Sequence, residues 1–158
     1  MRLLIVPARK GSKRIKDKNI FKIDKIPMFV HSLKTARNSK IFDVIHLSTD
    51  SEEYANIAKK HGFKVLFLRN KKMGGNNVPI IDVLKKECKN FKKLNYNFND
   101  ICMLTATSPL INYKDLINCK TLFEKNKRKY PVLSVAEFPG NIERALEIKK
   151  DKTLGYIR

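Results

Sequence analysis

The chain has 158 residues, of which 42% are hydrophobic and 31% are charged, and its formal net charge at pH 7 is +19. This length suits one domain with a buried core, and the hydrophobic content argues against an intrinsically disordered chain. No apolar run approaches the ~18 residues that a membrane-spanning helix needs, and the N-terminus lacks the pattern of a secretory signal peptide. We therefore expect a cytoplasmic protein without membrane contact.

The cysteines and the net charge indicate which metals and ligands the protein can bind. Cys88, Cys102 and Cys119 are widely spaced and form no Cys-x-x-Cys pair, which predicts free thiols in a reducing compartment and no metal cluster. A large positive charge can indicate nucleic-acid binding. However, Lys greatly outnumbers Arg and is spread along the whole chain, a pattern typical of an AT-rich genome. This composition favours small anionic substrates over nucleic acid.

Strand and helix patterns alternate along the chain. They predict strands at 3–6, 43–47, 64–68, 101–104 and 132–135, and helices at 27–38, 51–61, 79–88 and 112–124. This alternation indicates an α/β fold, doubly wound, with a mostly parallel sheet of the Rossmann-like kind. No repeat or domain boundary is evident, so we expect one core over residues 1–158. New structure begins after Leu146, and we expect this core to be incomplete at its C-terminus.

A basic loop, residues 7–20, follows the first predicted strand. It holds six Lys or Arg residues together with Asn19, whose amide offers a donor and an acceptor to a base or sugar. Loops at the carboxyl ends of parallel strands bind ligands in open α/β sheets. The loop lacks the G-x-x-x-x-G-K-[ST] pattern of an ATPase. A solvated lysine-rich loop is the alternative, but the position directly after the strand favours a polyphosphate site.

Individual residues of the basic loop suit phosphate binding. Gly11 lets the backbone approach a phosphate closely, and Ser12 adds a hydroxyl donor to the backbone N–H groups. Arg9 can donate to two phosphate oxygens at once, while Lys13 and Lys18 act as point charges.

Four segments, in the same order, resemble one enzyme family. They are P-A-R-x-G-S-K-R-I-x-x-K-N-I at 7–20, F-D-x-I through S-T-D at 42–50, Leu68-Arg69, and L-T-A-T-S-P-L at 104–110. Together they resemble the CMP-sugar acid synthetases, which are the acylneuraminate cytidylyltransferases and their relatives. The likeness covers essentially the whole chain. It implies a nucleotide-diphospho-sugar transferase fold and transfer of CMP from CTP to a nonulosonic acid, with release of pyrophosphate.

The resemblance also implies roles for single residues. It assigns the nucleotide to Arg9, Gly11, Ser12, Lys13, Lys18, Asn19, Arg69 and Thr105, with Arg9 and Lys18 as the catalytic pair. It assigns the sugar-acid pocket to Thr107, Pro109 and Arg144, although a surface role for Arg144 is equally open.

The substrate remains open within the family. Residues 134–138 and 142–146 resemble the pseudaminic-acid branch, although Asn141 replaces a proline of that motif. Alternatives are an enzyme for another sugar acid, such as deoxy-octulosonate, and a non-catalytic basic protein that binds nucleotide or nucleic acid. Aromatic residues spaced for base stacking are not evident, which counts against nucleic acid.

The resemblance implies CTP, a nine-carbon sugar acid and Mg²⁺ as partners, and a homodimer. In the family, the dimerisation arm and the acidic pair that binds magnesium lie in a C-terminal part that this sequence does not match. Asp50 and Asp100 lie near the ends of predicted strands, where they read as cap or turn residues. The metal ligands are therefore unknown from the sequence.

Overall fold

The computed structural model describes residues 1–12, 15–75, 78–135, 146–150 and 153–156. These residues form two compact units, Met1–Thr121 and Leu122–Arg158, which are described separately. Among the described residues, no helix combines the length and the apolar character needed to cross a membrane. The single core expected over residues 1–158 stays a prediction.

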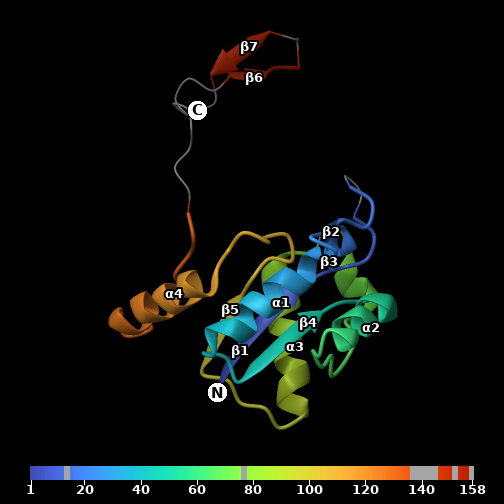
Figure 1. Cartoon of the computed structure of the whole chain (residues 1–158). Coiled ribbons are helices and arrows are strands. Elements are labelled where there is room, and N and C mark those ends of the chain that lie inside the picture. Colours follow the sequence, from blue (N-terminus) through green and yellow to red (C-terminus); the bar gives the residue numbers. More distant parts are fainter. Residues whose placement is uncertain (13–14, 76–77, 136–145, 151–152, 157–158) are drawn as a thin grey trace. The chain divides into compact units, whose positions relative to one another are not determined.

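All four predicted helices and three of the five predicted strands are present. Figure 1 shows the elements of the chain. In chain order they are β1 (Arg2–Pro7), η1 (Lys18–Ile20), β2 (Lys22–Ile23), β3 (Ile26–Pro27), α1 (Met28–Ser39), β4 (Val44–Ser48), α2 (Glu52–Lys60), η2 (Lys71–Gly74), α3 (Ile80–Lys93), β5 (Asp100–Met103), α4 (Tyr113–Lys125), β6 (Leu146–Ile148) and β7 (Leu154–Tyr156).

A three-stranded parallel sheet in the order β4-β1-β5 forms the centre of the larger unit. Leu4 on β1 is in register with Ile45 on β4 and with Cys102 on β5. Each parallel connection contains a helix, as such crossovers require. The central position of β1 explains why Leu3–Val6 is a continuous apolar run.

Side chains of β1 alternate between two cores. Leu4 and Val6 pack in one cluster with residues of α1, α2 and α4, whereas Leu3 and Ile5 pack in a second cluster with Phe91 of α3. Accordingly, α1 and α3 lie on opposite faces of the sheet (Figure 1). Each fully buried aliphatic side chain contributes about 1.5–3 kcal/mol of stability. The predicted α/β, doubly wound, parallel architecture is confirmed.

Local signals explain the ends of α2. The Ser51 hydroxyl oxygen accepts a hydrogen bond from the backbone N–H of Tyr54 at 3.3 Å, so Ser51 caps the N-terminus. Gly62 follows the helix with a φ of +79°, which a glycine adopts without a steric penalty.

The strand predicted at 64–68 is wrong. A groove of about 210 Å³, lined by Val44, His46, Lys64, Leu66 and Tyr96 among others, lies between this segment and β4. The segment returns to β4 only at its end, where the Arg69 N–H donates to the Thr49 carbonyl oxygen at 2.7 Å. Val65 and Phe67 pack on the two cores without joining the sheet, whereas Leu66 and Leu68 are 42% and 40% exposed.

The strand predicted at 132–135 is also wrong. This segment pairs with no strand among the described residues, and its Leu133 and Val135 side chains are 78% and 91% exposed. The sequence analysis missed two antiparallel hairpins, β2-β3 and β6-β7. In the first, Asp24 and Lys25 form the turn with φ values of 49° and 64°. A two-residue turn with both φ values positive normally carries Asn-Gly. Because Asp-Lys stands there instead, the sequence carries no signal for this hairpin.

Candidate functional site

The carboxyl ends of the three parallel strands meet at one edge of the sheet. The Ala8 N–H donates to the Ser48 carbonyl oxygen at 2.9 Å, which ties the loop after β1 to the end of β4. On the other side, the Leu104 N–H donates to the Ile5 carbonyl oxygen at 3.0 Å. Three loops, after β1, β4 and β5, therefore begin side by side, where open α/β sheets bind their ligands.

The basic loop is braced from within by Asn19. Its buried side-chain amide donates to the Arg9 carbonyl oxygen at 2.9 Å, joining the start of the loop to η1. Gly11 has a φ of +87°, and a Cβ built there would meet no atom within 4 Å. The backbone conformation, and not space, thus calls for glycine. Ser12 and Lys18 are half-buried, and Lys13 lies outside the described residues.

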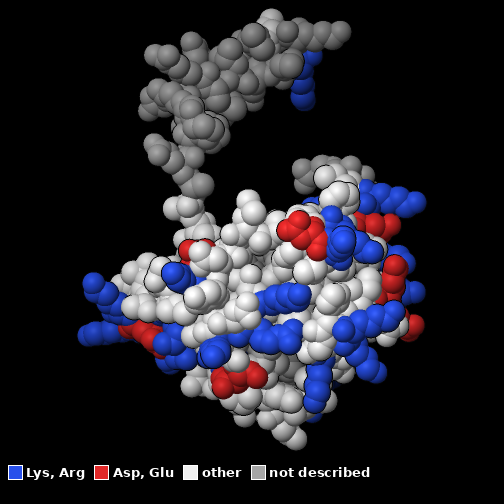
Figure 2. All heavy atoms as spheres, viewed as in Figure 1, with Lys and Arg blue, Asp and Glu red and all other residues white. Residues whose placement is uncertain are grey.

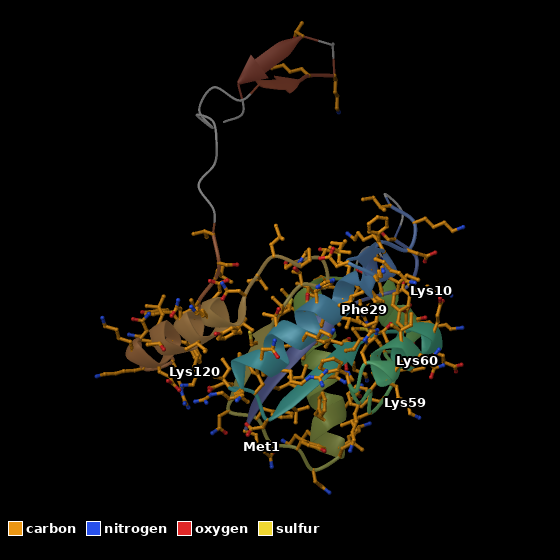
Figure 3. The ribbon with its side chains drawn as sticks, in the orientation of Figure 1. Met1, Lys10, Phe29, Lys59, Lys60 and Lys120 are labelled. Carbon is orange, nitrogen blue, oxygen red and sulfur yellow. The ribbon has the colours of Figure 1, made fainter. Side chains whose placement is uncertain are left out.

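Asp50 connects the loop after β4 to the basic loop. Its Oδ1 accepts the Lys10 backbone N–H at 2.9 Å. The Lys10 side chain extends toward α2, where Nζ lies 2.9 Å from Glu53 Oε2 (Figure 3). A hydrogen bond with Glu53, together with its charge, raises the pKa of Lys10. Asp50, read from the sequence as a cap or turn residue, holds this loop in place.

Arg9 and Arg69 both donate to the backbone of η2. Arg9 Nη1 donates to the Gly74 carbonyl oxygen at 3.0 Å, and Arg69 Nη1 lies 3.5 Å from the Met73 carbonyl oxygen. The second nitrogen of Arg69, Nη2, donates to the Ser48 carbonyl oxygen at 2.6 Å. Two guanidinium groups from distant parts of the chain are thus held at the same edge of the sheet by neutral acceptors.

The environment of Arg69 is electrostatically strained. Burial lowers the pKa of its guanidinium, the Arg9 charge lowers it further, and Asp50 and Glu87 act in the opposite direction. Its Nε is buried and has no hydrogen-bond acceptor among the described residues. A buried cation beside a second cation favours an anion at the same site.

The loop after β5 presents the remaining predicted site residues. Thr105 is exposed, its hydroxyl pairs with that of Ser108, and its carbonyl oxygen accepts the Ser32 hydroxyl at 2.9 Å. Thr107 is exposed and Pro109 is half-buried in the same loop. Arg144 lies outside the described residues.

The structure unites some predicted residues and adds others. Arg9, Asn19 and Arg69 lie together in the network described above, whereas Thr105 is on the same edge without a described contact to them. Sequence reasoning missed Gly74 and the structural role of Asp50. The Ser48-Thr49-Asp50 sequence at the end of a buried strand was the available signal for Asp50.

The cysteines and acidic groups of the described residues form no metal site. Cys88, Cys102 and Cys119 are free, as predicted. Within the described part of the chain, no group of three or more His, Cys, Asp or Glu side chains is placed to hold a metal ion.

Lys and Arg side chains are distributed over the visible face of the larger unit, among uncharged residues (Figure 2). They do not gather in one stripe on this face. The view agrees with the even spacing of lysine in the sequence.

Known proteins provide an independent comparison. The sequence matches the family described as "Cytidylyltransferase" over residues 3–154. It is 34% identical over 149 residues to the pseudaminic acid cytidylyltransferase of Campylobacter jejuni, covering 94% of this chain and 64% of that protein. It is 38% identical over 111 residues to the CMP-N,N'-diacetyllegionaminic acid synthase of the same species, covering 68% of this chain and 46% of that protein. The chain thus spans less than two thirds of the length of these relatives.

Solved structures show the same fold. A CMP:2-keto-3-deoxy-manno-octonic acid synthetase in complex with CTP matches with a TM-score of 0.68 and 17% identity, over 80% of this chain and 48% of that one. A cytidylyltransferase from Leptospira borgpetersenii matches with a TM-score of 0.62 and 25% identity, over 80% of this chain and 50% of that one. Because the family match covers nearly all of the sequence, this chain belongs to the cytidylyltransferase family.

Proposed function

We propose that this chain is the nucleotide-binding part of an enzyme that transfers CMP from CTP to a nonulosonic acid of the pseudaminic or sialic type, releasing pyrophosphate. Family membership and the 34% identity to a pseudaminic acid cytidylyltransferase support this activity. The single observation that carries the site assignment is the meeting of the Arg9 and Arg69 guanidinium groups at the carboxyl edge of the sheet.

The triphosphate of CTP binds at this edge in the proposal. Arg9 and Arg69 donate to the neutral carbonyl oxygens of Gly74 and Met73. Phosphate oxygens are charged acceptors, and hydrogen bonds to them are roughly twice as strong as those between neutral groups. The triphosphate can therefore replace these carbonyls, and it offers an acceptor to the unpaired Arg69 Nε.

The reaction is attack of the sugar-acid hydroxyl on the α-phosphate of CTP. A new oxygen–phosphorus bond forms, the bond to the pyrophosphate oxygen breaks, and the hydroxyl proton passes to water. Phosphoryl transfer of this kind depends on positioning and on neutralising charge that accumulates on the phosphate oxygens. In this scheme Arg9 and Lys18 neutralise that charge, and Gly11 and Ser12 supply backbone and hydroxyl donors.

The other residues have supporting roles in the proposal. Asn19 fixes the shape of the basic loop through the Arg9 carbonyl, so its contribution to cytidine binding is indirect. Thr105 faces the cytidine, while Thr107 and Pro109 border the sugar acid. Lys13 and Arg144, which the sequence also assigns to the nucleotide and the sugar acid, are outside the described residues.

The carboxylates at the site can be compared with the ligands that a bound Mg²⁺ requires. Protein-bound Mg²⁺ takes oxygen ligands in near-octahedral geometry, mainly carboxylates, phosphates and water. Asp50 and Glu53 both contact the basic loop at Lys10, and Asp50 Oδ1 is already bonded to the Lys10 N–H. The described residues contain no cluster of metal-binding side chains. The residues present do not fit a protein-built magnesium site, and the proposed scheme contains no step through the metal.

The sugar acid is proposed to be pseudaminic acid. The pseudaminic acid cytidylyltransferase aligns over 94% of this chain, whereas the legionaminic acid synthase aligns over 68%. The match to the octonic acid synthetase, at 17% identity, supports the fold alone.

Turnover with a panel of sugar acids tests this function. The chain is incubated with CTP, MgCl₂ and either pseudaminic, N,N'-diacetyllegionaminic, N-acetylneuraminic or deoxy-octulosonic acid. Pyrophosphate release and the mass of the CMP-sugar are then measured. We expect product with pseudaminic acid and a large loss of rate in Arg9→Ala and Lys18→Ala, but not in the control Lys59→Ala on α2. The absence of product with every sugar acid would contradict the proposed activity of this chain.

A further inference from the structure

A buried chain of polar groups runs from α3 through the end of β4 to Arg69. The Ser48 hydroxyl donates to Glu87 Oε1 at 2.8 Å, and the Ser48 carbonyl oxygen accepts from Arg69 Nη2 at 2.6 Å. Ser48 and Glu87 are 0% exposed and Arg69 is 6% exposed. Ser48 therefore joins Glu87 through its hydroxyl and Arg69 through its backbone carbonyl, inside the protein and away from solvent.

Glu87 occupies a position where an apolar residue is expected. It lies on the buried side of α3 together with Val83 and Phe91. Burying a carboxylate costs several kcal/mol, and well-packed apolar side chains are often as good or better for stability at such positions. Packing alone does not account for Glu87. What a leucine could not provide is an acceptor for the Ser48 hydroxyl.

The surroundings of Glu87 are closed and specific. His46 Nε2 lies 3.3 Å from Glu87 Oε2. The His46 ring packs against Phe67 and Phe91, with ring centroids 4.7 and 5.0 Å away. The 3.3 Å approach of His46 does not have hydrogen-bond geometry, so the hydrogen bond from the Ser48 hydroxyl is the one described for this carboxylate.

The last residue of β4 and the residue after it connect Glu87 to the candidate site through their backbone carbonyl oxygens. The Ser48 carbonyl oxygen also accepts the Ala8 N–H, and the Thr49 carbonyl oxygen accepts the Arg69 N–H. Ser48 is therefore the point at which the basic loop and Arg69 are anchored together. The negative charge of Glu87 additionally favours the charged form of the Arg69 guanidinium, countering the effect of burial on its pKa.

We propose that Glu87, through the Ser48 hydroxyl, is a positioning residue that sets the location of the Arg69 guanidinium at the nucleotide site. Glu87 acts from the opposite face of the sheet from α1 and needs no contact with the nucleotide. This inference rests on the proposed function only in taking CTP as the ligand that Arg69 binds.

Three variants separate positioning from packing. Glu87→Leu removes the acceptor for Ser48, Glu87→Gln retains an oxygen acceptor, and Ser48→Ala removes the donor. The matched control is Phe98→Leu, which alters the same core and whose ring contacts are with Phe91 and Tyr96. Dissociation constants for CTP are measured by calorimetry, each variant also being made in an Arg69→Lys background.

We expect Glu87→Leu and Ser48→Ala to weaken CTP binding by about five- to tenfold, the size of one hydrogen bond, and Glu87→Gln to restore most of the affinity. In the Arg69→Lys background the same changes should have no further effect, and Phe98→Leu should lower stability without changing affinity. If Glu87→Leu fails to fold, Ser48→Ala decides the question. Equal effects in both backgrounds, or no effect of Ser48→Ala on affinity, would overturn the proposal.

A second readout needs no nucleotide. The buried Arg69 Nε–H should exchange slowly with water and give an NMR signal that is identified by its loss in Arg69→Lys. We expect Ser48→Ala to speed this exchange and Phe98→Leu to leave it unchanged. Failure of the wild type to bind CTP would contradict the proposed function. The positioning role of Glu87 would be refuted separately, by an unchanged exchange rate of the Arg69 Nε–H in Ser48→Ala.

Discussion

The guanidinium of Arg69 lies 2.6 Å from the backbone carbonyl oxygen of Ser48, at the last residue of β4. This bond attaches a buried cation to the edge of the sheet where the basic loop also begins. Because Ser48 accepts the Ala8 N–H with the same oxygen, this one carbonyl anchors both Arg69 and the start of the basic loop.

Arg69→Lys should therefore impair both stability and nucleotide binding. Lysine carries a single nitrogen, so it cannot reach the Ser48 and Met73 carbonyls together. We expect the free energy of unfolding to fall by about 1–3 kcal/mol and the Kd for CTP to rise about tenfold. Urea denaturation and calorimetry measure the two effects.

Arg37→Lys is the matched control for this substitution. Arg37 is exposed on α1, donates to the His61 carbonyl oxygen at 3.0 Å and stacks over the Phe63 ring. Its replacement should cost about 0.5–1 kcal/mol and leave the Kd for CTP unchanged. Equal changes in affinity for the two variants would show that Arg69 has no particular part in the site.

Gly74→Ala should disturb the site through Asp50. A Cβ at Gly74 would lie 2.7 Å from Asp50 Oδ2, while Asp50 Oδ1 holds the Lys10 N–H. The carboxylate must move, and its bond to the basic loop weakens, which should cost about 1 kcal/mol of stability and lower CTP affinity.

Gly75→Ala provides the comparison for this prediction. Its Cβ would meet Val78 Cγ2 at 3.5 Å, which is an ordinary contact. We expect wild-type affinity and stability from this variant. The account of Asp50 would be wrong if thermal unfolding and calorimetry gave the same values for the two alanine variants.

Asn19→Ala distinguishes bracing of the loop from recognition of the base. The Asn19 amide donates to the Arg9 carbonyl oxygen and is buried, so its loss should loosen the loop that holds the triphosphate. We expect CTP and UTP affinities to fall by the same factor, about five- to tenfold. A selective loss of CTP binding, with UTP binding unchanged, would instead show that Asn19 contacts cytosine.

Alkaline pH should lower the free energy of unfolding because Tyr54 is buried. Burial, followed by the charges of Asp17 and Glu53, raises the pKa of Tyr54 from its usual 10 to about 12. Above pH 10 the unfolded chain loses the phenol proton while the folded chain keeps it, so the stability that Tyr54 contributes is lost as the pH rises from 10 to 12. We expect the unfolding free energy to fall more steeply in the wild type than in Tyr54→Phe over this range. Parallel slopes in urea titrations would contradict this.

The central fold could be predicted because its signals are local. The apolar run at Leu3–Val6, the Ser51 cap and Gly62 each specify a short piece of backbone from its own residues. The two wrong strands have the same apolar pattern, but a strand also needs a partner. Residues 64–68 pair with no strand of the described sheet, and a missing strand partner is a tertiary property that a short sequence window does not reveal.

The sequence predicts the cationic residues of the site, but it does not predict the groups to which they bind. Arg9 and Arg69 stand in recognisable motifs, whereas the carbonyl oxygens of Met73 and Gly74 carry no side-chain signal at all. Glu87 did carry one, because a charged residue interrupts the apolar side of α3 between Val83 and Phe91. Such an interruption indicates a buried partner, although the sequence alone cannot say that the partner is Ser48.

The most direct test of the nucleotide site is calorimetry of CTP, UTP, ATP and GTP with magnesium, at two salt concentrations. The variants are Arg9→Ala and Lys18→Ala, with Lys59→Ala as the control for loss of one surface charge. We predict a clear preference for CTP that is lost in the first two variants and kept in the third. Equal binding of all four nucleotides, weakening steeply with salt and unchanged in Arg9→Ala and Lys18→Ala, would mean that the basic loop is only a charged surface and would contradict the account.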